Sequence, residues 1–286
     1  SMSKPAGRIR VIKDARKTPE GGTTAPYELP EFGGERTVLV SGGSRRDQEY
    51  ILPAELLMGE LLDRCGLAED RVKAICLGWP SGHILPTSDR TAKVKLECET
   101  LYAVSTDECI VDVLVRLAQE LRDCSCGRCV FGREGTYQMH LTLSDIAGKK
   151  ARSTDLEQLA FLCGLMRTQT NCSMGQTAAN AVLDALEGFR QEIEAHITER
   201  VCPHHVCREF VSYYIDPAVC SGCTECVDAC DEDAIIGKRG MIHILEQDDC
   251  EKCGACAEAC PVGAVRITGG AVPRVPSRPI PCGTWK

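Results

Sequence analysis

The sequence predicts an α+β protein made of three small folded parts. The first observation is a strand–helix–strand pattern before residue 105, and the second is a series of helical segments between residues 105 and 200. The third is a pair of matched four-cysteine runs between Cys220 and Cys260. At 286 residues the chain is long enough for several small units, and this pattern favours them over a single core.

Composition sets the class of protein. Charged residues make up 26% and hydrophobic residues 43%, as in a soluble globular protein. No apolar run is long enough for a membrane span, and the N-terminus has no signal-peptide pattern. The net charge of −8 argues against a nucleic-acid partner. Most of the 20 cysteines have metal-type spacings, which together with the missing export signal favours the reducing cytoplasm.

Six segments are expected along the chain. They are an extended N-terminal arm (1–35), a β-grasp-like domain (36–104), a helical-bundle domain (105–200), a Cys/His linker (201–212), a module around the two cysteine runs (213–268) and an extended C-terminal tail (269–286). The arm and the tail contain prolines and glycines without periodicity, which predicts extended chain rather than packed elements.

The β-grasp-like domain is predicted from local patterns. RTVLVSGG (36–43) is typical of a strand that enters a turn. Residues 52–67 carry apolar side chains near helical spacing, and Gly66 can end that helix. VKAICLGWPSGHILP then predicts a strand, a Gly/Pro turn and a short strand. A strand–helix–strand order of this length fits a β-grasp unit.

The next segment is predicted to be a bundle of four helices. Residues 108–124 carry an apolar stripe at helical spacing, formed by Ile110, Val113, Leu114, Leu117 and Leu121. Helices are also expected over 136–146 and 154–166, and a loop followed by a long helix over 170–197. Short connections between four helices favour a bundle.

The two cysteine runs carry the clearest chemistry. Each reads C-x2-C-x2-C-x3-C, the spacing of bacterial two-cluster ferredoxins, in which the fourth cysteine binds the other cluster. We therefore assign Cys220, Cys223, Cys226 and Cys260 to one 4Fe–4S cluster, and Cys250, Cys253, Cys256 and Cys230 to a second. A zinc ribbon also uses C-x2-C pairs, but two matched runs of four favour iron–sulfur clusters.

A third cluster is expected in the bundle. Cys126, Cys129 and Cys172 stand on loops at helix ends that can meet at one end of the bundle. The ferredoxin spacing requires a further cysteine at position 132, where this chain has Gly132. Cys124 is the nearest substitute. The alternatives are a cluster with three protein ligands, a smaller 2Fe–2S cluster, or no cluster.

The linker predicts a structural zinc site. His196, Cys202 and Cys207 supply three ligands of the types that a closed tetrahedral zinc site uses. The fourth ligand is expected to be His204, His205 or Cys282 from the C-terminal tail. In the alternative interpretation, these side chains only pack in a hinge.

The order of these motifs resembles a known flavoprotein family. ECIVDV, SCGRCVFGREG and the NCSMGQTAANAVLDALEGF segment follow one another as in the NADH-binding subunit of bacterial complex I. The CP-x3-C link and the two ferredoxin motifs that come next resemble the hydrogenase branch of this family. The resemblance is closer to the beta subunit of NAD-dependent and electron-bifurcating iron–iron hydrogenases, and it covers residues 36–268. It implies an SLBB-type β-grasp domain, and it implies that Cys126, Cys129 and Cys172 bind the 4Fe–4S cluster nearest the flavin.

Two departures from that family limit what the resemblance implies. The chain has no Gly-rich nucleotide loop, so NADH oxidation by this chain itself is not expected. The family's loop reads SCGKCxxCREG, and Gly132 replaces its third cysteine. This replacement leaves the type of the bundle cluster open.

The predicted function is that of an iron–sulfur electron-transfer subunit in a hetero-oligomeric oxidoreductase of anaerobic metabolism. Its expected partners are a flavin- or NAD(P)H-binding subunit and a catalytic reductase or hydrogenase subunit. One alternative is an enzyme that binds substrate at an incompletely ligated cluster near Gly132, although no acid–base constellation accompanies it. The other is a docking scaffold in which only the ferredoxin clusters are active.

Overall fold

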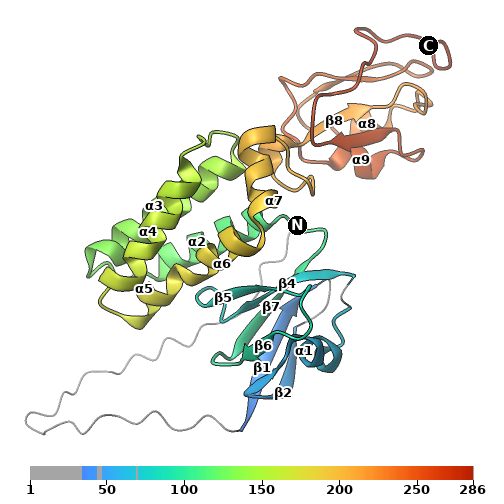
Figure 1. Ribbon diagram of the computed structural model, residues 1–286. Helices are drawn as coiled ribbons and strands as arrows, with labels where there is room; N and C mark the ends of the chain where they lie inside the picture. The colour runs from blue at the N-terminus through green and yellow to red at the C-terminus, as the bar shows by residue number, and fades with distance from the viewer. Residues whose placement is uncertain (1–33, 44–46, 69, 286) are drawn as a thin grey trace, which may run out of the picture. The chain divides into compact units, whose positions relative to one another are not determined.

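A computed structural model describes residues 34–43, 47–68 and 70–285 (Figure 1). Nearly all of the predicted N-terminal arm lies outside these residues. The chain divides into two units, Ser1–Phe32 and Gly33–Lys286, and the second contains every element described below. Helices and sheets both contribute, which confirms the predicted α+β class. In this described part, no helix is both long and apolar enough to cross a membrane.

The first folded part is a five-stranded sheet with one helix. Its strands are β1 (Glu35–Gly42), β2 (Gln48–Pro53), β4 (Val72–Leu77), β5 (His83–Pro86) and β7 (Thr100–Ser105), in the order β2-β1-β7-β4-β5. The β1–β7 pair is parallel and the other three pairs are antiparallel. Val38 and Val40 point into the core with Leu61 and Leu62 of the helix α1 (Met58–Cys65).

The helix of this part begins later than the sequence predicted. A helix was expected over 52–67, but residues Glu55–Leu57 form strand β3, which pairs with β6 (Lys93–Lys95). This pairing satisfies the backbone groups of β3 outside a helix. α1 therefore begins at Met58, where the Glu60 carboxylate accepts a hydrogen bond from the Leu57 amide at 3.2 Å. It ends before Gly66, whose φ is 61°.

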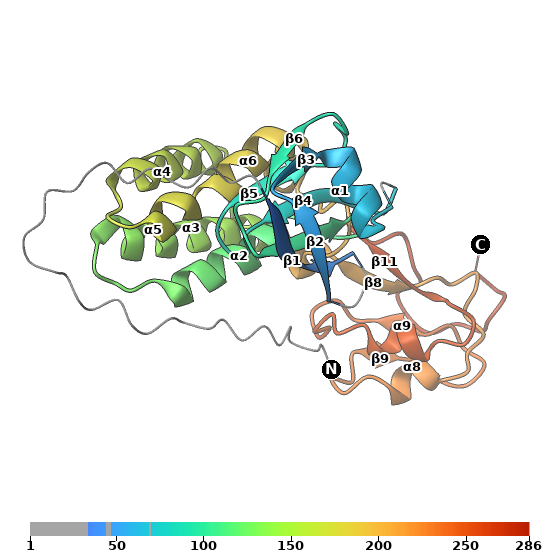
Figure 2. The same cartoon turned by 90° about the horizontal axis from the view of Figure 1, so that it is seen from below.

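The second part is helical, as predicted. Helix α2 (Ile110–Cys124) packs against α3 (Val130–Ala147), and α3 packs against α4 (Asp155–Gln169), as Figures 1 and 2 show from two directions. The whole predicted stripe of α2 is buried, which confirms the pattern that identified this helix. α3 begins directly after Cys129 and is longer than the predicted 136–146.

The expected long helix at the end of the bundle is interrupted. It consists of α5 (Ser173–Ala178), α6 (Asn180–Gly188), α7 (Arg190–Glu194) and a π-helical turn (Ala195–Glu199). A Cβ atom at Gly188 would lie 2.9 Å from the Pro86 ring of β5, so close contact with the sheet favours glycine at this point. Phe189 then leaves helical backbone conformation, with φ −128° and ψ 27°. Glycine lowers helix propensity as well.

The third part contains the two cysteine runs. β8 (Ser212–Ile215) pairs antiparallel with β11 (Val265–Thr268), and β9 (Ile235–Ile236) pairs antiparallel with β10 (Ile244–Leu245). Two short helices, α8 (Glu225–Asp228) and α9 (Ala255–Ala259), contain the third cysteine of each run. Its small core contains Ile215, Ile235, Leu245, Ala264 and Val265, together with Cys226 and Cys256.

Candidate metal centres

The two cysteine runs fold as the same loop. Two residues after the first cysteine, Gly222 and Lys252 both have positive φ angles, of 73° and 57°. Two residues further on, Thr224 and Gly254 do so again, at 79° and 84°. Positive φ is uncommon for residues other than glycine, so the same conformation at matched positions marks a shared backbone path. Each path carries three cysteines around one small volume.

The thiols gather into two groups of four. Burial, followed by the charges of Cys220, Cys223 and Cys260, raises the pKa of Cys226 to about 12. Burial, followed by Cys250, Cys230 and Cys253, raises the pKa of Cys256 to about 11. Each group thus joins three cysteines of one run to the fourth cysteine of the other run. In two-cluster ferredoxins the fourth cysteine of each run likewise binds the other cluster.

The second group lines a cavity of about 140 Å³. Cys230, Cys250, Cys253 and Cys256 all border it. Backbone amides donate to sulfurs of both groups: Lys252 N–H to Cys250 Sγ of the second group at 3.4 Å, and Ala264 N–H to Cys260 Sγ of the first group at 3.2 Å. Burial opposes the thiolate of Cys260, but backbone donors around Val265 outweigh it and lower the pKa of this thiol. Four thiols around a hollow, with donors to their sulfurs, fit an iron–sulfur cluster.

A separate and more compact group lies where the bundle meets the linker. It consists of Cys109, His196, Cys202 and Cys207, whose ligand atoms all lie within 4.8 Å of one another. Cys109 Sγ is 3.3 Å from His196 Nε2 and 3.6 Å from Cys207 Sγ. All four side chains are buried. Two sulfurs bound at about 2.3 Å to one tetrahedral zinc ion lie ~3.8 Å apart, so these spacings fit a single ion.

The histidine of this group is prepared for metal binding. His196 Nδ1 lies 2.8 Å from the Glu192 carbonyl oxygen, to which it donates a proton, so the lone pair of Nε2 faces the sulfurs. Hydrogen bonds from Cys109 and Cys207 lower the pKa of Cys202. Contacts with Cys109 and Cys202 raise the pKa of Cys207, and the contact with Cys202 raises that of Cys109 to about 12. Negative charge therefore concentrates on one sulfur, which a divalent cation would stabilise.

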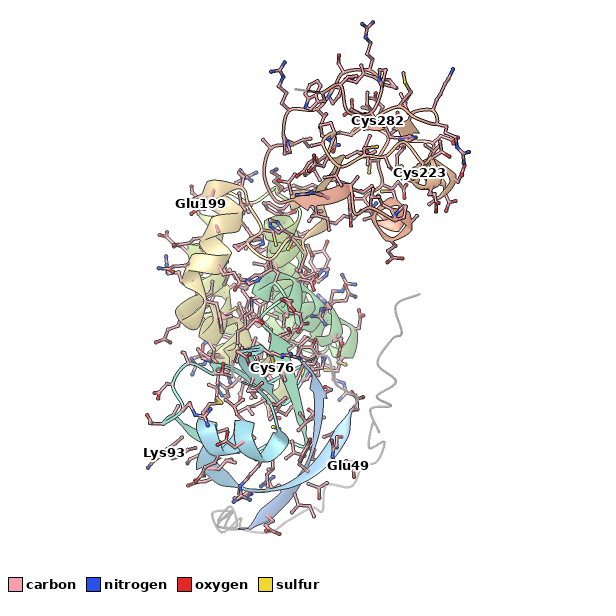
Figure 3. All side chains as sticks on the ribbon, turned by 90° about the vertical axis from the view of Figure 1, so that its right-hand side faces the viewer. Glu49, Cys76, Lys93, Glu199, Cys223 and Cys282 are labelled. Carbon is pink, nitrogen blue, oxygen red and sulfur yellow. The ribbon has the colours of Figure 1, made fainter. Side chains whose placement is uncertain are left out.

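The fourth member of the group was not found from the sequence. Cys109 lies at the start of α2, and the predicted Cys282 is not in the group. Cys282 lies instead in the C-terminal module, where Figure 3 also labels Cys223, and burial followed by the nearby Cys220 raises the pKa of its thiol. The other candidates also face elsewhere. His204 Nε2 lies 3.1 Å from Lys73 Nζ, and the His205 ring lies against Gly269.

The bundle cysteines occupy loops that meet at one end of the helices. Cys129 precedes α3 and Cys172 precedes α5, where Cys172 Sγ accepts a hydrogen bond from the Gly175 amide at 3.4 Å. The Asn171 and Gly132 amides donate to the Cys129 thiol and lower its pKa. A Cβ atom at Gly132 would lie 2.7 Å from Cys129 Sγ. Position 132, where the ferredoxin spacing requires a cysteine, therefore lies directly beside the Cys129 sulfur.

The two remaining candidates stand nearby in the chain. Cys124 is the last residue of α2 and Cys126 follows it, and both are exposed. Within the described residues, the bundle cysteines do not form a group compact enough for one ion. Their spacing is therefore compatible with a larger cluster or with separate thiols, and the geometry does not choose Cys124 as a ligand.

Comparison with known proteins identifies two iron–sulfur regions. Residues 112–196 match the NADH-ubiquinone oxidoreductase-F iron-sulfur binding region. Residues 219–265 match the 4Fe-4S dicluster domain. The first region spans the bundle and ends at His196, and the second contains both cysteine runs. These matches confirm the predicted iron–sulfur chemistry.

Curated relatives agree with the resemblance seen in the sequence. The chain is 31% identical over 181 residues to the NADP-reducing hydrogenase subunit HndC of Solidesulfovibrio fructosivorans, covering 60% of this chain and 37% of the relative. It is 30% identical over 187 residues to an NADH-quinone oxidoreductase subunit of Rhizobium meliloti, covering 60% of this chain and 44% of the relative. The chain thus spans less than half the length of these two relatives.

A solved structure shares the fold. A chain of an NAD⁺-reducing [NiFe]-hydrogenase in the H2-reduced state superposes with a TM-score of 0.54 and 28% sequence identity. The superposition covers 59% of this chain and 31% of that one. The predicted resemblance to redox-complex subunits is therefore confirmed, and it concerns the iron–sulfur portion of those larger chains.

Proposed function

We propose that this chain is an iron–sulfur electron-transfer subunit of a multisubunit oxidoreductase. It relays electrons between a partner flavoprotein or catalytic subunit and another redox partner. The observation that carries the proposal is the pair of four-thiol groups, each built from three cysteines of one run and one of the other. Isolated thiols do not require cysteines of the two runs to be grouped together, whereas two neighbouring 4Fe–4S clusters of the ferredoxin type do.

The residues of each site have defined roles in this proposal. Cys220, Cys223, Cys226 and Cys260 hold one 4Fe–4S cluster, and Cys250, Cys253, Cys256 and Cys230 hold the second. Clusters at these positions would supply one-electron redox chemistry. The chain itself supplies thiolates, burial and backbone N–H donors, as at Cys250 and Cys260. Such donors stabilise the extra negative charge of a reduced site and so raise its potential.

Two further sites belong to the proposal. Cys126, Cys129 and Cys172 hold a third iron–sulfur cluster, with Cys124 or a non-protein group completing the ligand set beside Gly132. Cys109, His196, Cys202 and Cys207 hold a structural zinc ion. The compact spacing of this second group supports zinc, because one tetrahedral ion closes it without an open position. The zinc site would join the start of α2 to the linker.

The partners follow from the part of the relatives that this chain matches. Both curated relatives are named as subunits of NAD(P)-linked enzymes, and each is more than twice as long as the matched portion. We therefore propose that a flavin- or NAD(P)H-binding chain completes the complex. The cytoplasm is the proposed location, since thiol ligands persist there in the reduced form.

Anaerobic purification followed by iron analysis and EPR tests the proposal. Two 4Fe–4S clusters require about eight iron atoms per chain, and a 4Fe–4S bundle cluster adds about four. Reduced protein should show magnetically interacting signals. Loss of one signal in Cys126→Ser would support the bundle site, and an unchanged spectrum would remove it. Zinc in place of iron in the two runs would overturn the electron-transfer function. A change in one signal on substrate addition would favour the enzyme alternative.

A further inference from the structure

The C-terminal tail is not free of the cluster module. Residues 280–282 run antiparallel to residues 240–242 and form an isolated bridge between Met241 and Pro281. The Ile242 amide donates to the Ile280 carbonyl at 2.7 Å, and the Cys282 amide donates to the Gly240 carbonyl at 3.1 Å. The tail is therefore fixed by backbone hydrogen bonds on both sides of Pro281.

Residues 240–242 in turn contact the first cysteine loop. The Gly240 amide donates to the Gly222 carbonyl at 2.9 Å. A Cβ atom at Gly222 would lie only 2.7 Å from the Gly240 nitrogen, so the two backbones touch. The loop that begins at Cys220, the 240–242 segment and the 280–282 segment thus lie in three successive layers. This stacking brings a cysteine from the chain's end to the first run.

The sulfur of Cys220 has two side-chain neighbours outside its own run. Cys282 lies beside it, and burial followed by the charge of Cys220 raises the pKa of the Cys282 thiol. His243 Nδ1 lies 3.6 Å from Cys220 Sγ, and the histidine ring is 1% exposed. The Nε2 atom of His243 has no hydrogen-bond partner among the described residues. A buried histidine therefore contacts the sulfur of Cys220.

We propose that Cys282 is a reserve ligand of the first cluster and can take the coordination position of Cys220. This inference rests on the proposed function, in which Cys220, Cys223, Cys226 and Cys260 hold that cluster. An iron atom bonded to Cys220 lies about 2.3 Å from its sulfur, by analogy with zinc–thiolate bonds. Because backbone hydrogen bonds of the tail hold Cys282 beside the first cysteine loop, rotation of its side chain is the movement that we expect to bring its sulfur to that metal position.

The exchange is a ligand substitution and transfers no electrons. The Cys282 thiol gives up its proton as its sulfur bonds to iron. The bond between iron and Cys220 breaks, and the proton passes to the released Cys220 sulfur. In a chain that lacks Cys220, the proton passes to solvent instead. Five cysteines are then available for the four coordination positions of the first cluster.

The second run provides the matched control. Its first cysteine, Cys250, stands at the position equivalent to Cys220 and has the Lys252 amide as its hydrogen-bond donor. The bridge of the C-terminal tail is to residue 241, which follows the first run and precedes the second. A difference between removal of Cys220 and removal of Cys250 therefore isolates the contribution of the tail.

The test uses the full chain, purified anaerobically as wild type, Cys220→Ala, Cys250→Ala, Cys282→Ala and the double variant Cys220→Ala/Cys282→Ala. Iron and acid-labile sulfide per chain and the EPR spectrum of the reduced protein are measured. We expect Cys220→Ala and Cys282→Ala to retain wild-type iron. We expect Cys250→Ala and the double variant each to lose about four iron atoms.

Alkylation gives a second readout that does not depend on iron content. Iodoacetamide should label the Cys282 peptide in the wild type but much less in Cys220→Ala, where Cys282 is bound to iron. A Cys220→Ser variant repeats the test with a smaller change in shape. Loss of the cluster from both Cys220 variants, or equal labelling of Cys282, would overturn the reserve-ligand proposal. Iron missing from the wild-type runs would instead overturn the proposed function.

Discussion

Lys73 Nζ lies 2.8 Å from Glu192 Oε2, and both side chains are only 13% exposed. The pair joins strand β4 to helix α7. The Glu192 carboxylate also accepts a hydrogen bond from the Ile110 amide, at 2.6 Å, directly after Cys109. Its carbonyl accepts the Nδ1 proton of His196. One residue therefore connects the sheet with two members of the compact metal group.

Replacement of Glu192 by alanine should destabilise the protein. It leaves the Lys73 charge and the Ile110 amide without their acceptor, at a cost of about 2–4 kcal/mol in the free energy of unfolding. Glu194→Ala on the same helix is the matched control, because its pair with Arg190 is 39% and 61% exposed. The control should change stability by no more than about 0.5 kcal/mol. Urea denaturation measures both, and equal effects would contradict the role of Glu192.

The compact metal group predicts zinc content. Wild-type protein should hold about one zinc ion per chain, and Cys109→Ala should lose it, because three remaining ligands leave the tetrahedron open. Cys282→Ala should retain the zinc, since this residue lies beside Cys220. Cys163→Ala controls for the loss of a buried bundle cysteine, whose thiol contacts Met139 instead. Elemental analysis by mass spectrometry decides; zinc loss in Cys282→Ala would restore the ligand set expected from the sequence.

The contact between the sheet and α6 should weaken as pH rises. The hydrogen bond from His83 Nδ1 to Asp184, 2.7 Å long, raises the pKa of this histidine. A histidine whose pKa is raised in the folded state contributes its full stabilisation below the unfolded-state pKa of about 6.5. That stabilisation is lost as the pH rises through the folded-state pKa. Because His83 is 53% exposed, the effect is at most about 1 kcal/mol. The wild type should lose more unfolding free energy than His83→Gln between pH 6 and pH 8.

Position 132 offers a direct test of the bundle cluster. Gly132→Cys completes the C-x2-C-x2-C spacing, so reconstituted protein should bind more iron and give a stronger bundle signal. The new Cβ lies 2.7 Å from Cys129 Sγ, a side-chain end that can rotate away. Gly132→Ala adds the same Cβ without a sulfur and serves as the control. Equal iron in the two variants would show that position 132 does not reach the cluster.

The sequence identified most of the fold because the relevant signals are local. The stripe of α2 repeats at helical spacing and is buried, and the ferredoxin runs have their ligands at fixed short spacings. The start of α1 was placed too early because residues 55–57 are governed by pairing with β6, some forty positions away. The end of α6 is set by contact with Pro86, which helical periodicity does not include.

The compact metal group also shows that local sequence patterns do not reveal contacts between distant segments. His196, Cys202 and Cys207 lie close together in the sequence and could be selected from it. Cys109 lies 87 positions before His196, between Glu108 and the apolar Ile110 at the start of a helix. Its one signal is a cysteine directly before a buried stripe, which is also typical of ordinary core packing. Only the packing of α2 against α7 brings it to the group.

The exchange of fourth cysteines between the two runs has an evolutionary consequence. The matching backbone paths of the two runs are consistent with an internal duplication. However, Cys260 of the second run lies with the first group, and Cys230 of the first run lies with the second group. In the proposed function, neither run alone could bind a complete cluster if it were moved into another protein. The C-terminal bridge to Met241 makes the halves unequal as well. Loss of a cysteine from one run therefore also affects the cluster proposed for the other run. For this reason the two runs have to evolve and be engineered together.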